Sequence, residues 1–342
     1  MNNSASLRVA AGERLFRLLG IEIPIVQAPI GSLASPELAA EVSNAGGLGS
    51  LALTWTNPVG VAALIADFRR RSAQPLCANF VLAFEPVGLN DALQAGIPVV
   101  SFSWGLPGPL VKRVRSFGAL VGVQVGSADG AKRALEEGCD FLIAQGVEAG
   151  GHVQSSTALP ELLPIIVELA QHTPVIAAGG LVDGADIAAM LRLGASGAML
   201  GTRFVASNES RAHQDYKNAL VAAQAKDTVL TGCFDGGWPH AQHRVLRNST
   251  FTSWEAEGCL PTGRRPGEGD LISARNDVTI VRYEDVPPNR EMSGDVLACC
   301  LYAGAGVGKI KSIEAAGVLV RGLWREALKD LTGVSGQAKQ AT

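Results

Sequence analysis

Residues 141–152 read Phe-Leu-Ile-Ala-Gln-Gly-Val-Glu-Ala-Gly-Gly-His. This segment is an apolar run that leads directly into a glycine-rich turn, and the turn ends on a histidine. Such a run is typical of a buried strand, and glycines permit turns in which a ligand can approach the backbone. Histidine is the side chain that most readily acts as a base near neutral pH. The segment therefore predicts a strand that ends at a ligand site.

The same layout recurs on both sides of this segment. Short apolar runs alternate with amphipathic stretches, and eight such strand–helix units predict a (β/α)₈ TIM barrel of the α/β class. A doubly wound open sheet is the alternative, but it calls for a Gly-x-Gly-x-x-Gly turn after an early strand, and none follows the first two. The predicted strands are 25–28, 48–53, 76–81, 99–103, 120–125, 141–144, 175–178 and 197–200, and the predicted helices are 36–46, 57–71, 88–95, 109–117, 127–137, 159–171, 183–193 and 208–225.

The regular pattern stops near residue 226. Residues 227–297 are rich in Gly, Pro, Trp and charged side chains, with a short strand expected at 227–231 and a loop at 261–270. Helical periodicity returns over 312–331, which we expect to pack on the barrel. The prediction is a barrel made of residues 1–226 and 298–342, with 227–297 as a small appended cap domain.

Composition excludes several classes of function. The chain has 342 residues, 18% of them charged, a net charge of −3 and a pI of about 6.0, so no broad attraction to nucleic acid or to an anionic membrane is expected. No apolar run is long enough to cross a membrane, and residues 1–20 lack the layout of a signal peptide. The six cysteines include no Cys-x-x-Cys pair. A reducing, cytoplasmic compartment fits best.

The ligand face of such a barrel is formed by the C-terminal ends of its strands. No pair of carboxylates stands there, which argues against glycoside hydrolysis, and no His/Asp/Glu cluster does, which argues against a metal. A neutral, planar ligand with a polar edge and a phosphate suits these ends better. They are Gln27-Ala28-Pro29, Thr54, Asn79, Ser103-Trp104, Gln124, Gln145 to His152, Gly179-Gly180 and Gly201-Thr202.

Glycines at the ends of the last two strands indicate where a phosphate would bind. Gly179-Gly180 and Gly201-Thr202 could offer backbone N–H groups to it; the alternative is that these glycines only permit tight turns. The side-chain amides of Asn79, Gln124 and Gln145 offer donors and acceptors that match the edge of a flavin. His152 would then be a general base for a carbon acid beside that flavin.

Two further motifs invite a functional interpretation that the residues do not support. The stretch Gly304-Ala-Gly-Val-Gly-Lys-Ile310 looks like a P-loop, but Ile310 replaces the hydroxyl residue that would bind magnesium. We interpret it as a close-packed loop that lines the same pocket as Tyr302. His240 and His243 match no common zinc spacing and are not expected to bind a metal.

At this point the chain resembles the nitronate monooxygenases, formerly 2-nitropropane dioxygenases, which are FMN-dependent (β/α)₈ barrels. The resemblance covers most of residues 20–325, and its Glu-Ala-Gly-Gly-His element is fairly specific. It is carried by Gln27 to Ile30, Ser43 to Gly49, Gln145 to His152, Ala177 to Gly180, Gly201 to Phe204 and Tyr302-Ala303-Gly304.

The resemblance implies an enzyme that oxidises alkyl nitronates or nitroalkanes with O₂ to carbonyl compounds and nitrite. His152 would deprotonate the nitroalkane, and Ile30 and Tyr302 would line the substrate pocket. Ile30 stands where methionine is more usual and Ala305 where glutamine often follows, so the substrate is left open. A homodimer is an additional expectation. Residues expected to hold FMN, by resemblance or by position at strand ends, are Ala28, Asn79, Gln124, Gln145, Gly150, Gly151, Gly179, Gly180, Met199, Leu200, Gly201 and Thr202.

Two alternatives remain open. The flavin-type enoyl-acyl-carrier-protein reductases share the Glu-Ala-Gly-Gly-His element, and NADH:quinone reductases are also relatives, so an NADH-dependent flavin reductase is one of them. Against the enoyl reductases, this chain has Gln-Ala-Pro rather than Gln-Gly-Gly after the first strand. The other alternative is a barrel that binds a flavin, or only a phosphate, without turnover.

Overall fold

Eight parallel strands form the larger lobe of the protein. The computed structural model describes residues 13–276 and 278–333. Neighbouring strands pair in the order β1-β9-β8-β6-β5-β4-β3-β2, and β1 returns to β2 through a parallel bridge between Val26 and Leu48. The predicted (β/α)₈ TIM barrel is therefore confirmed. The strands are β1 (Ile25–Gln27), β2 (Gly49–Ala52), β3 (Leu76–Val81), β4 (Val99–Ser103), β5 (Leu120–Val125), β6 (Phe141–Gln145), β8 (Val175–Ala178) and β9 (Gly197–Leu200).

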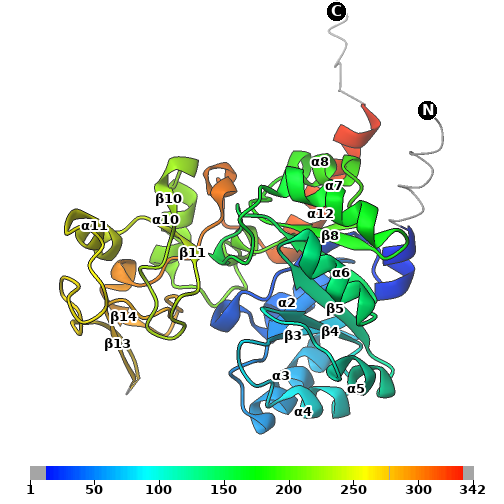
Figure 1. The fold of residues 1–342 in the computed structure, drawn as a ribbon, viewed down its shortest axis with the longest axis horizontal. Coiled ribbons are helices and arrows are strands. Elements are labelled where there is room, and N and C mark those ends of the chain that lie inside the picture. The colour runs from blue at the N-terminus through cyan, green and yellow to red at the C-terminus, as the bar shows by residue number, and fades with distance from the viewer. Residues whose placement is uncertain (1–12, 277, 334–342) are drawn as a thin grey trace, which may run out of the picture.

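Seven helices follow seven of these strands and surround the sheet (Figure 1). Four of them begin at predicted polar caps: Ser35, Asn57, Ser127 and Asp183 each accept a backbone N–H from the first turn. Arg69, Arg70 and Arg71 end the second of these helices. The helices are α2 (Pro36–Asn44), α3 (Pro58–Arg71), α4 (Leu89–Gln94), α5 (Leu110–Ser116), α6 (Ala128–Glu136), α7 (Leu159–Ala170) and α8 (Gly184–Arg192).

The eighth helix of the barrel is not the one that the sequence predicted. The helix expected at 208–225 is α10 (Gln214–Ala222), which follows the short α9 (Thr202–Val205), but its buried Tyr216 and Leu220 pack in a separate core beneath the cap. The last helix, α12 (Ala316–Thr332), packs against α8 and α2 instead. Its Leu319, Val320 and Leu323 belong to the main core around the sheet. Apolar contact with the sheet thus decides which helix completes the ring of helices around the barrel.

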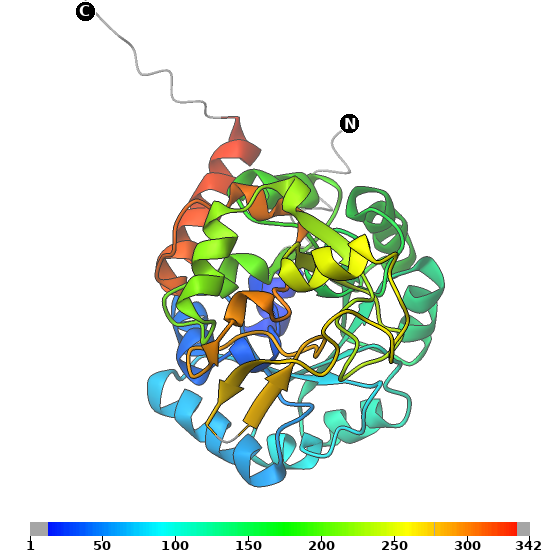
Figure 2. The ribbon, with the colours of Figure 1, turned by 90° about the vertical axis from the view of Figure 1, so that its left-hand side faces the viewer.

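The smaller lobe contains two three-stranded sheets and the helix α11, and it lies across one end of the barrel (Figure 2). One sheet has the order β10-β11-β7 and the other the order β13-β12-β14. The expected strand near 227–231 and the expected loop at 261–270 are both present. The elements are β10 (Thr228–Thr231), β11 (His243–Leu246), α11 (Ser249–Ala256), β12 (Leu271–Arg275), β13 (Val278–Val281) and β14 (Ser293–Gly294).

One strand of the first cap sheet comes from the barrel. β7 (Gly151–His152) lies in the turn after β6, and it pairs antiparallel with β11 so that His152 faces His243 and Gly151 faces Arg244. The glycine-rich turn is therefore a structural part of both lobes. The division of the chain at residues 227 and 297 stays a prediction. The sheet β10-β11-β7 contains strands from both sides of the first of these boundaries.

Candidate active site

A cavity of about 710 Å³ opens at the C-terminal ends of the barrel strands, beneath the cap. Pockets that bind small molecules and cofactors have volumes of roughly 300–1,000 Å³. The structure brings all but one of the predicted site residues together here. They are Ala28, Ile30, Asn79, Gln124, Gln145, Gly150, Gly151, His152, Gly179, Gly180, Met199, Gly201, Thr202 and Tyr302.

Leu200 is the exception. Its side chain belongs to the core between the sheet and the helices, whereas the neighbouring Met199 points into the barrel interior and lines the cavity. Successive side chains of a strand point to opposite faces of the sheet, so two adjacent residues cannot both face the ligand. Leu200 is therefore not part of the cavity lining, and its assignment as a cofactor-binding residue stays a prediction.

His152 lies on the cavity wall between the two lobes. Its imidazole ring contacts those of Trp238 at a centroid distance of 4.3 Å and Tyr302 at 5.6 Å. Its backbone carbonyl accepts a hydrogen bond from the Gln145 amide at 3.2 Å. The Nε2 atom is buried, and it has no hydrogen-bond partner among the described residues. A buried polar atom without a partner is costly, so a ligand group is the natural partner for Nε2.

Burial keeps His152 neutral. Removal of the ring from water, together with a smaller effect of the neighbouring His243, lowers its pKa from 6.5 to about 3. A neutral imidazole offers one nitrogen lone pair and can accept a proton. An anion beside the ring would stabilise the imidazolium and raise its pKa again. The ring is thus arranged to accept a proton from a reaction that also creates negative charge.

His243 has a structural role. Its Nε2 accepts the backbone N–H of Phe234 at 3.1 Å, and its Nδ1 lies 3.0 Å from the carbonyl oxygen of Ala241, to which it can donate. Both nitrogens are occupied, so this histidine cannot relay a proton. No group of three or more metal-ligating side chains occurs within residues 13–276 and 278–333.

The three predicted amides all line the cavity, and each also bonds within the protein. Gln145 accepts the backbone N–H of Gln154 at 2.8 Å, which together with its bond to His152 holds the turn in place. Asn79 donates to the Ser101 hydroxyl at 3.1 Å, and Gln124 donates to the Gln154 side chain at 2.8 Å. No described group donates to the amide oxygens of Asn79 or Gln124. Those two oxygens remain available to a ligand.

Cavity-lining residues at the ends of β8 and β9 also have backbone N–H groups without protein acceptors. In the part of the chain that the structure describes, those of Gly179, Gly180, Gly201 and Thr202 donate no hydrogen bond. Gly179 and Gly180 have φ values of 126° and 69°, which other residues rarely adopt. Adjacent free N–H groups of this kind form an anion-binding surface.

The evenly spaced glycines of 304–308 explain the P-loop-like motif. Residues Ala305–Lys309 form a short 3₁₀ helix, and its first turn packs directly on the turns after β6 and β8. A Cβ atom at Gly306 would lie 2.0 Å from the carbonyl oxygen of Gly180, and one at Gly150 would lie 2.5 Å from the backbone nitrogen of Gly304. The predicted close-packed loop is confirmed, and it fixes the backbone beneath the cavity.

Glu148 and Arg244 hold the turn from outside. The Glu148 carboxylate accepts the N–H of Leu159 at 3.0 Å, and so caps α7, whose own N-cap, Ala158, supplies no side-chain bond. The guanidinium of Arg244 donates to the carbonyl of Val147 at 2.9 Å. The sequence offered no signal for Arg244, because it stands in the irregular region and contacts the turn only through the tertiary fold.

Sequence reasoning also missed most of the aromatic side chains of the site. Trp55, Phe84 and Trp238 line the cavity, as does Trp104, which stood at a strand end without an expected role. The charged side chains among the described lining residues are Arg275 and Asp285. Burial raises the pKa of Asp285. Trp238 and Asp285 come from the cap, where no periodic pattern marked them.

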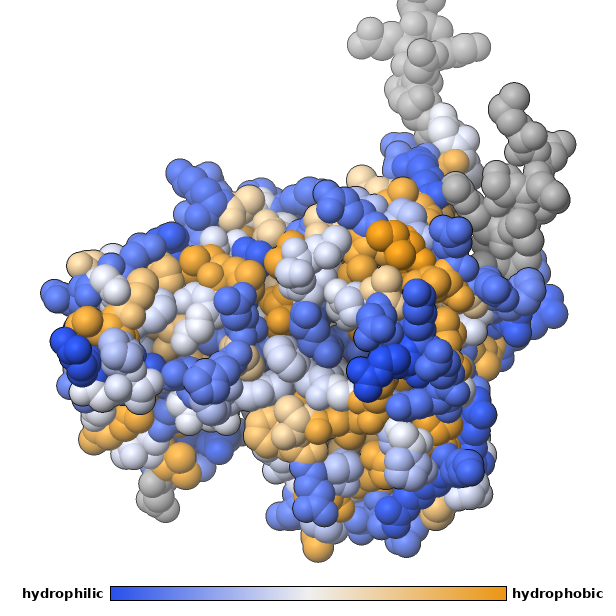
Figure 3. All heavy atoms as spheres, viewed as in Figure 1, coloured by the Kyte–Doolittle hydropathy of each residue, from blue (hydrophilic) through white to orange (hydrophobic). Residues whose placement is uncertain are grey.

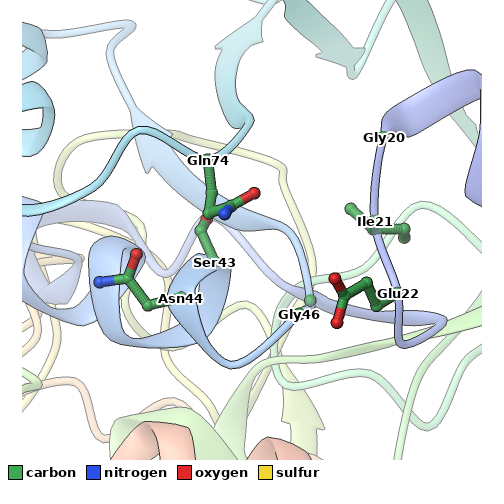
Figure 4. A pocket seen from close by; sticks show the side chains of 8 residues that line it. Gly20, Ile21, Glu22, Ser43, Asn44, Gly46 and Gln74 are labelled. Carbon is green, nitrogen blue, oxygen red and sulfur yellow. The ribbon is translucent and has the colours of Figure 1, made fainter.

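A second, much smaller cleft is lined by residues that precede β1, β2 and β3, and Figure 4 shows it from close by. It has a volume of about 40 Å³ and is lined by Gly20 to Glu22, Ser43, Asn44, Gly46, Gly47 and Gln74. That volume suits one or two water molecules rather than a substrate.

No helix within the described residues is long and apolar enough to cross a membrane.

Comparison with known proteins places the chain in a family. The family model described as "Nitronate monooxygenase" matches residues 12–89 and 88–326. A nitronate monooxygenase from Pseudomonas aeruginosa is 30% identical, over 90% of this chain and 97% of that protein. The crystal structure of a nitroalkane oxidase from Streptomyces ansochromogenes superposes with a TM-score of 0.75 at 30% identity, over 94% of this chain and all of that one.

A relative with a different name is equally similar. The (3aS,4S,5R,7aS)-5-hydroxy-7a-methyl-1-oxo-octahydro-1H-indene-4-carboxyl-CoA dehydrogenase of Rhodococcus jostii is 32% identical, over 80% of this chain and 73% of that protein. The matches therefore share a fold and an oxidoreductase character, and they suggest a flavin cofactor. Since the family model spans nearly the whole described chain, the protein belongs to the nitronate monooxygenase family.

Proposed function

We propose that the cavity binds FMN and that the protein oxidises alkyl nitronates or nitroalkanes with O₂ to carbonyl compounds and nitrite. The observation that carries this proposal is the buried, neutral and unpartnered Nε2 of His152, a residue that lines a cavity large enough for a cofactor. Family membership supports the reaction class.

The residues present fit FMN. The free N–H groups of Gly179, Gly180, Gly201 and Thr202 would hold its phosphate, since successive backbone N–H groups bind anions without a cationic side chain. The amide oxygens of Asn79 and Gln124 would accept hydrogen bonds from the polar edge of the ring. Ala28, Gln145, Gly150, Gly151 and Met199 line the space between these groups.

His152 would supply the proton transfer. A nitroalkane is a carbon acid, and its conversion to the nitronate needs a base beside the α-carbon. The neutral ring can accept this proton, and the negative charge left on the nitronate then stabilises the imidazolium. The bound flavin would supply the oxidising power that the side chains lack. Tyr302 and Ile30 would shape the space for the substrate.

Replacement of His152 by alanine tests this assignment. We expect nitrite formation from neutral nitroethane to fall roughly 10²- to 10⁴-fold, as for the loss of a general base. Oxidation of preformed ethyl nitronate should persist, because its proton is already absent. The absorption spectrum of the purified variant should show that FMN stays bound.

His172→Ala is the matched control, because His172 is exposed on the surface after α7. It should leave both activities unchanged. Wild-type activity of the His152→Ala protein on neutral nitroethane would disprove the assignment of His152 as the base. Equal loss on the nitroalkane and on the nitronate would show that His152 acts in a step other than proton removal.

A second candidate function is a flavin-dependent reaction on an acyl thioester. It is favoured by the similarity to a protein named as a carboxyl-CoA dehydrogenase, and a base such as His152 could equally take the α-proton of a thioester. An NADH-dependent reduction of an enoyl thioester or a quinone belongs to the same group. Anaerobic mixing with NADH separates the candidates: rapid bleaching of the flavin favours the reductase, and its absence favours the monooxygenase.

The visible spectrum of the purified protein tests the cofactor itself. A protein that shows no flavin absorption, and gains none with added FMN, would be a phosphate-binding barrel without flavin. A protein that binds FMN but turns over neither nitronate nor NADH would be a flavin carrier. A homodimer and a cytoplasmic location stay predictions.

A further inference from the structure

Four aromatic side chains form one side of the cavity, and we call them the aromatic wall: Trp55, Phe84, Trp104 and Trp238. Three of them follow the adjacent strands β2, β3 and β4, and Trp238 comes from the cap between β10 and β11. Because these strands are neighbours, their ends place the three rings on the same side of the barrel mouth.

The aromatic wall is continuous from the protein surface to the proposed base. Ring centroids lie 5.3 Å apart between Trp55 and Phe84 and 5.2 Å apart between Phe84 and Trp238. Trp238 then lies 4.3 Å from His152, with the ring planes inclined by 32°. Trp104 contacts Trp238 at 4.6 Å and supports it from the barrel side. These spacings are those of packed aromatic pairs.

The outer end of the wall is unusually exposed for such side chains. Trp55 is 61% exposed, and Val59 and Val87, which follow Trp55 and Phe84 along the chain, are also exposed. Figure 3 shows hydrophobic surface where the barrel lobe borders the notch beneath the cap. Exposed apolar surface that continues into a cavity marks a place where an apolar ligand binds.

The backbone at Trp104 gives a second, independent indication. Its φ is 58°, a left-handed conformation that is rare for a bulky residue. Such strain is unfavourable, and it persists at sites where the position of a side chain matters for function. The strained residue directs its indole onto Trp238, which is the ring that touches His152.

A small nitroalkane held beside His152 would leave most of this wall unused. Its few carbons could contact Trp238, but Phe84 and Trp55 lie one and two ring-to-ring steps farther out. We propose that the substrate of this protein is a carbon acid that carries a flat apolar substituent, an aryl or fused-ring group, which lies along the aromatic wall. The inference rests on the proposed function in one respect, namely that the reacting group of the substrate is a carbon acid.

The test measures binding rather than turnover, so that it stands apart from the proposed reaction. The probe is 2-naphthoate, a flat fused-ring carboxylate whose planar head resembles a nitro group and which has no α C–H to remove. Titration calorimetry of the purified, FMN-loaded protein should give at least tenfold tighter binding of 2-naphthoate than of propanoate. Trp55→Ala and Phe84→Ala should each weaken 2-naphthoate binding about five- to tenfold, the order expected for the loss of one aromatic contact.

Two variants make the result specific. Trp55→Phe keeps a ring on the wall and should restore most of the affinity. Phe117→Ala removes an aromatic side chain that is 51% exposed but lies outside the cavity, and it should change nothing. Equal affinity of the wild type for the two carboxylates, or unchanged 2-naphthoate affinity in Trp55→Ala and Phe84→Ala, would overturn the inference. Failure of the proposed reaction would appear separately, as no nitrite from any nitronate.

Discussion

His152 shows how tertiary contacts set the chemistry of a single side chain. A histidine in water has a pKa near 6.5 and is partly charged at neutral pH. Here Trp238, Tyr302 and His243 surround the ring, and the loss of water lowers the pKa to about 3. The sequence located the residue at the ligand face, but only its neighbours determine that it is neutral.

This lowered pKa predicts how stability depends on pH. Between pH 3 and 6.5 the unfolded chain binds a proton at His152 that the folded chain does not bind. The free energy of unfolding therefore rises with pH across this window. The contribution of His152 to this rise is about 1.4 kcal/mol per pH unit, and it is lost again as the pH falls. Urea unfolding of wild-type protein and His152→Gln, measured at intervals from pH 4 to 7, should show a shallower slope in the variant.

His172→Gln provides the comparison for this experiment, because it removes an exposed histidine. It should leave the slope unchanged. His243 also has a lowered pKa, so part of the dependence of stability on pH should remain in the wild type and in both variants. Identical slopes for wild type and His152→Gln would mean that His152 is not held neutral in the folded protein.

At the scale of elements, the turn after β6 depends on a strand from the cap. β7 pairs with β11, and Arg244 of β11 donates to Val147 within the turn. Ala303, just before the glycine-rich 3₁₀ helix, also donates its backbone N–H to the carbonyl of Arg244, at 3.1 Å. One cap strand thus fixes two of the loops that surround the cavity.

Loss of the Arg244 guanidinium should therefore disturb the site from a distance. Arg244→Met keeps the apolar stem but leaves the Val147 carbonyl without its donors. We expect the free energy of unfolding to fall by about 1–3 kcal/mol, the cost of an unsatisfied group in a buried setting. The rate with neutral nitroethane should fall as His152 loses its fixed position. Chemical denaturation and nitrite assays measure the two effects.

Arg247 lies just beyond the same strand and is a suitable control. Its guanidinium pairs with Glu255 at 2.7 Å on the surface, and exposed pairs of this kind contribute about 0–1 kcal/mol. Arg247→Met should therefore have little effect on stability and none on the nitrite assay. If Arg244→Met behaves in the same way as Arg247→Met, the cap strand does not position the turn.

At the scale of the whole molecule, the two lobes are joined by contacts that the chain order does not reveal. The barrel gives β7 to a cap sheet. Returning from the cap, the chain places Tyr302 beside His152 and then forms α12, the helix that fills the eighth position of the barrel. The cavity has walls from both lobes. These shared elements indicate that neither lobe completes the site alone.

We expect the two lobes to unfold in one transition. Calorimetry of the full chain should give a single peak whose calorimetric and van't Hoff enthalpies agree. FMN at one hundred times its Kd should add about 2.7 kcal/mol and move the whole peak upward. Two separated peaks, with only one of them shifted by FMN, would show that the cap folds independently of the barrel.

Much of the barrel follows from local physics in the sequence. Apolar runs of four to six residues become strands because only a buried parallel sheet covers both of their faces, as for Leu76–Val81 and Leu120–Val125. Ser35, Asn57 and Asp183 begin helices because their side chains satisfy N–H groups of the first turn. The sequence also marked the site, because strand ends in a barrel converge on one face.

Contacts between residues far apart in the sequence decided the remaining features of the fold and of the site. Which helix completes the ring depended on whether α10 or α12 could bury its apolar face against the sheet. Leu200 was excluded from the cavity by strand alternation in the folded register. The aromatic wall, the Arg244 contact and the neutral state of His152 all join segments far apart along the chain. Local sequence signals report only near neighbours, so these features arise only when the packed fold brings the segments together.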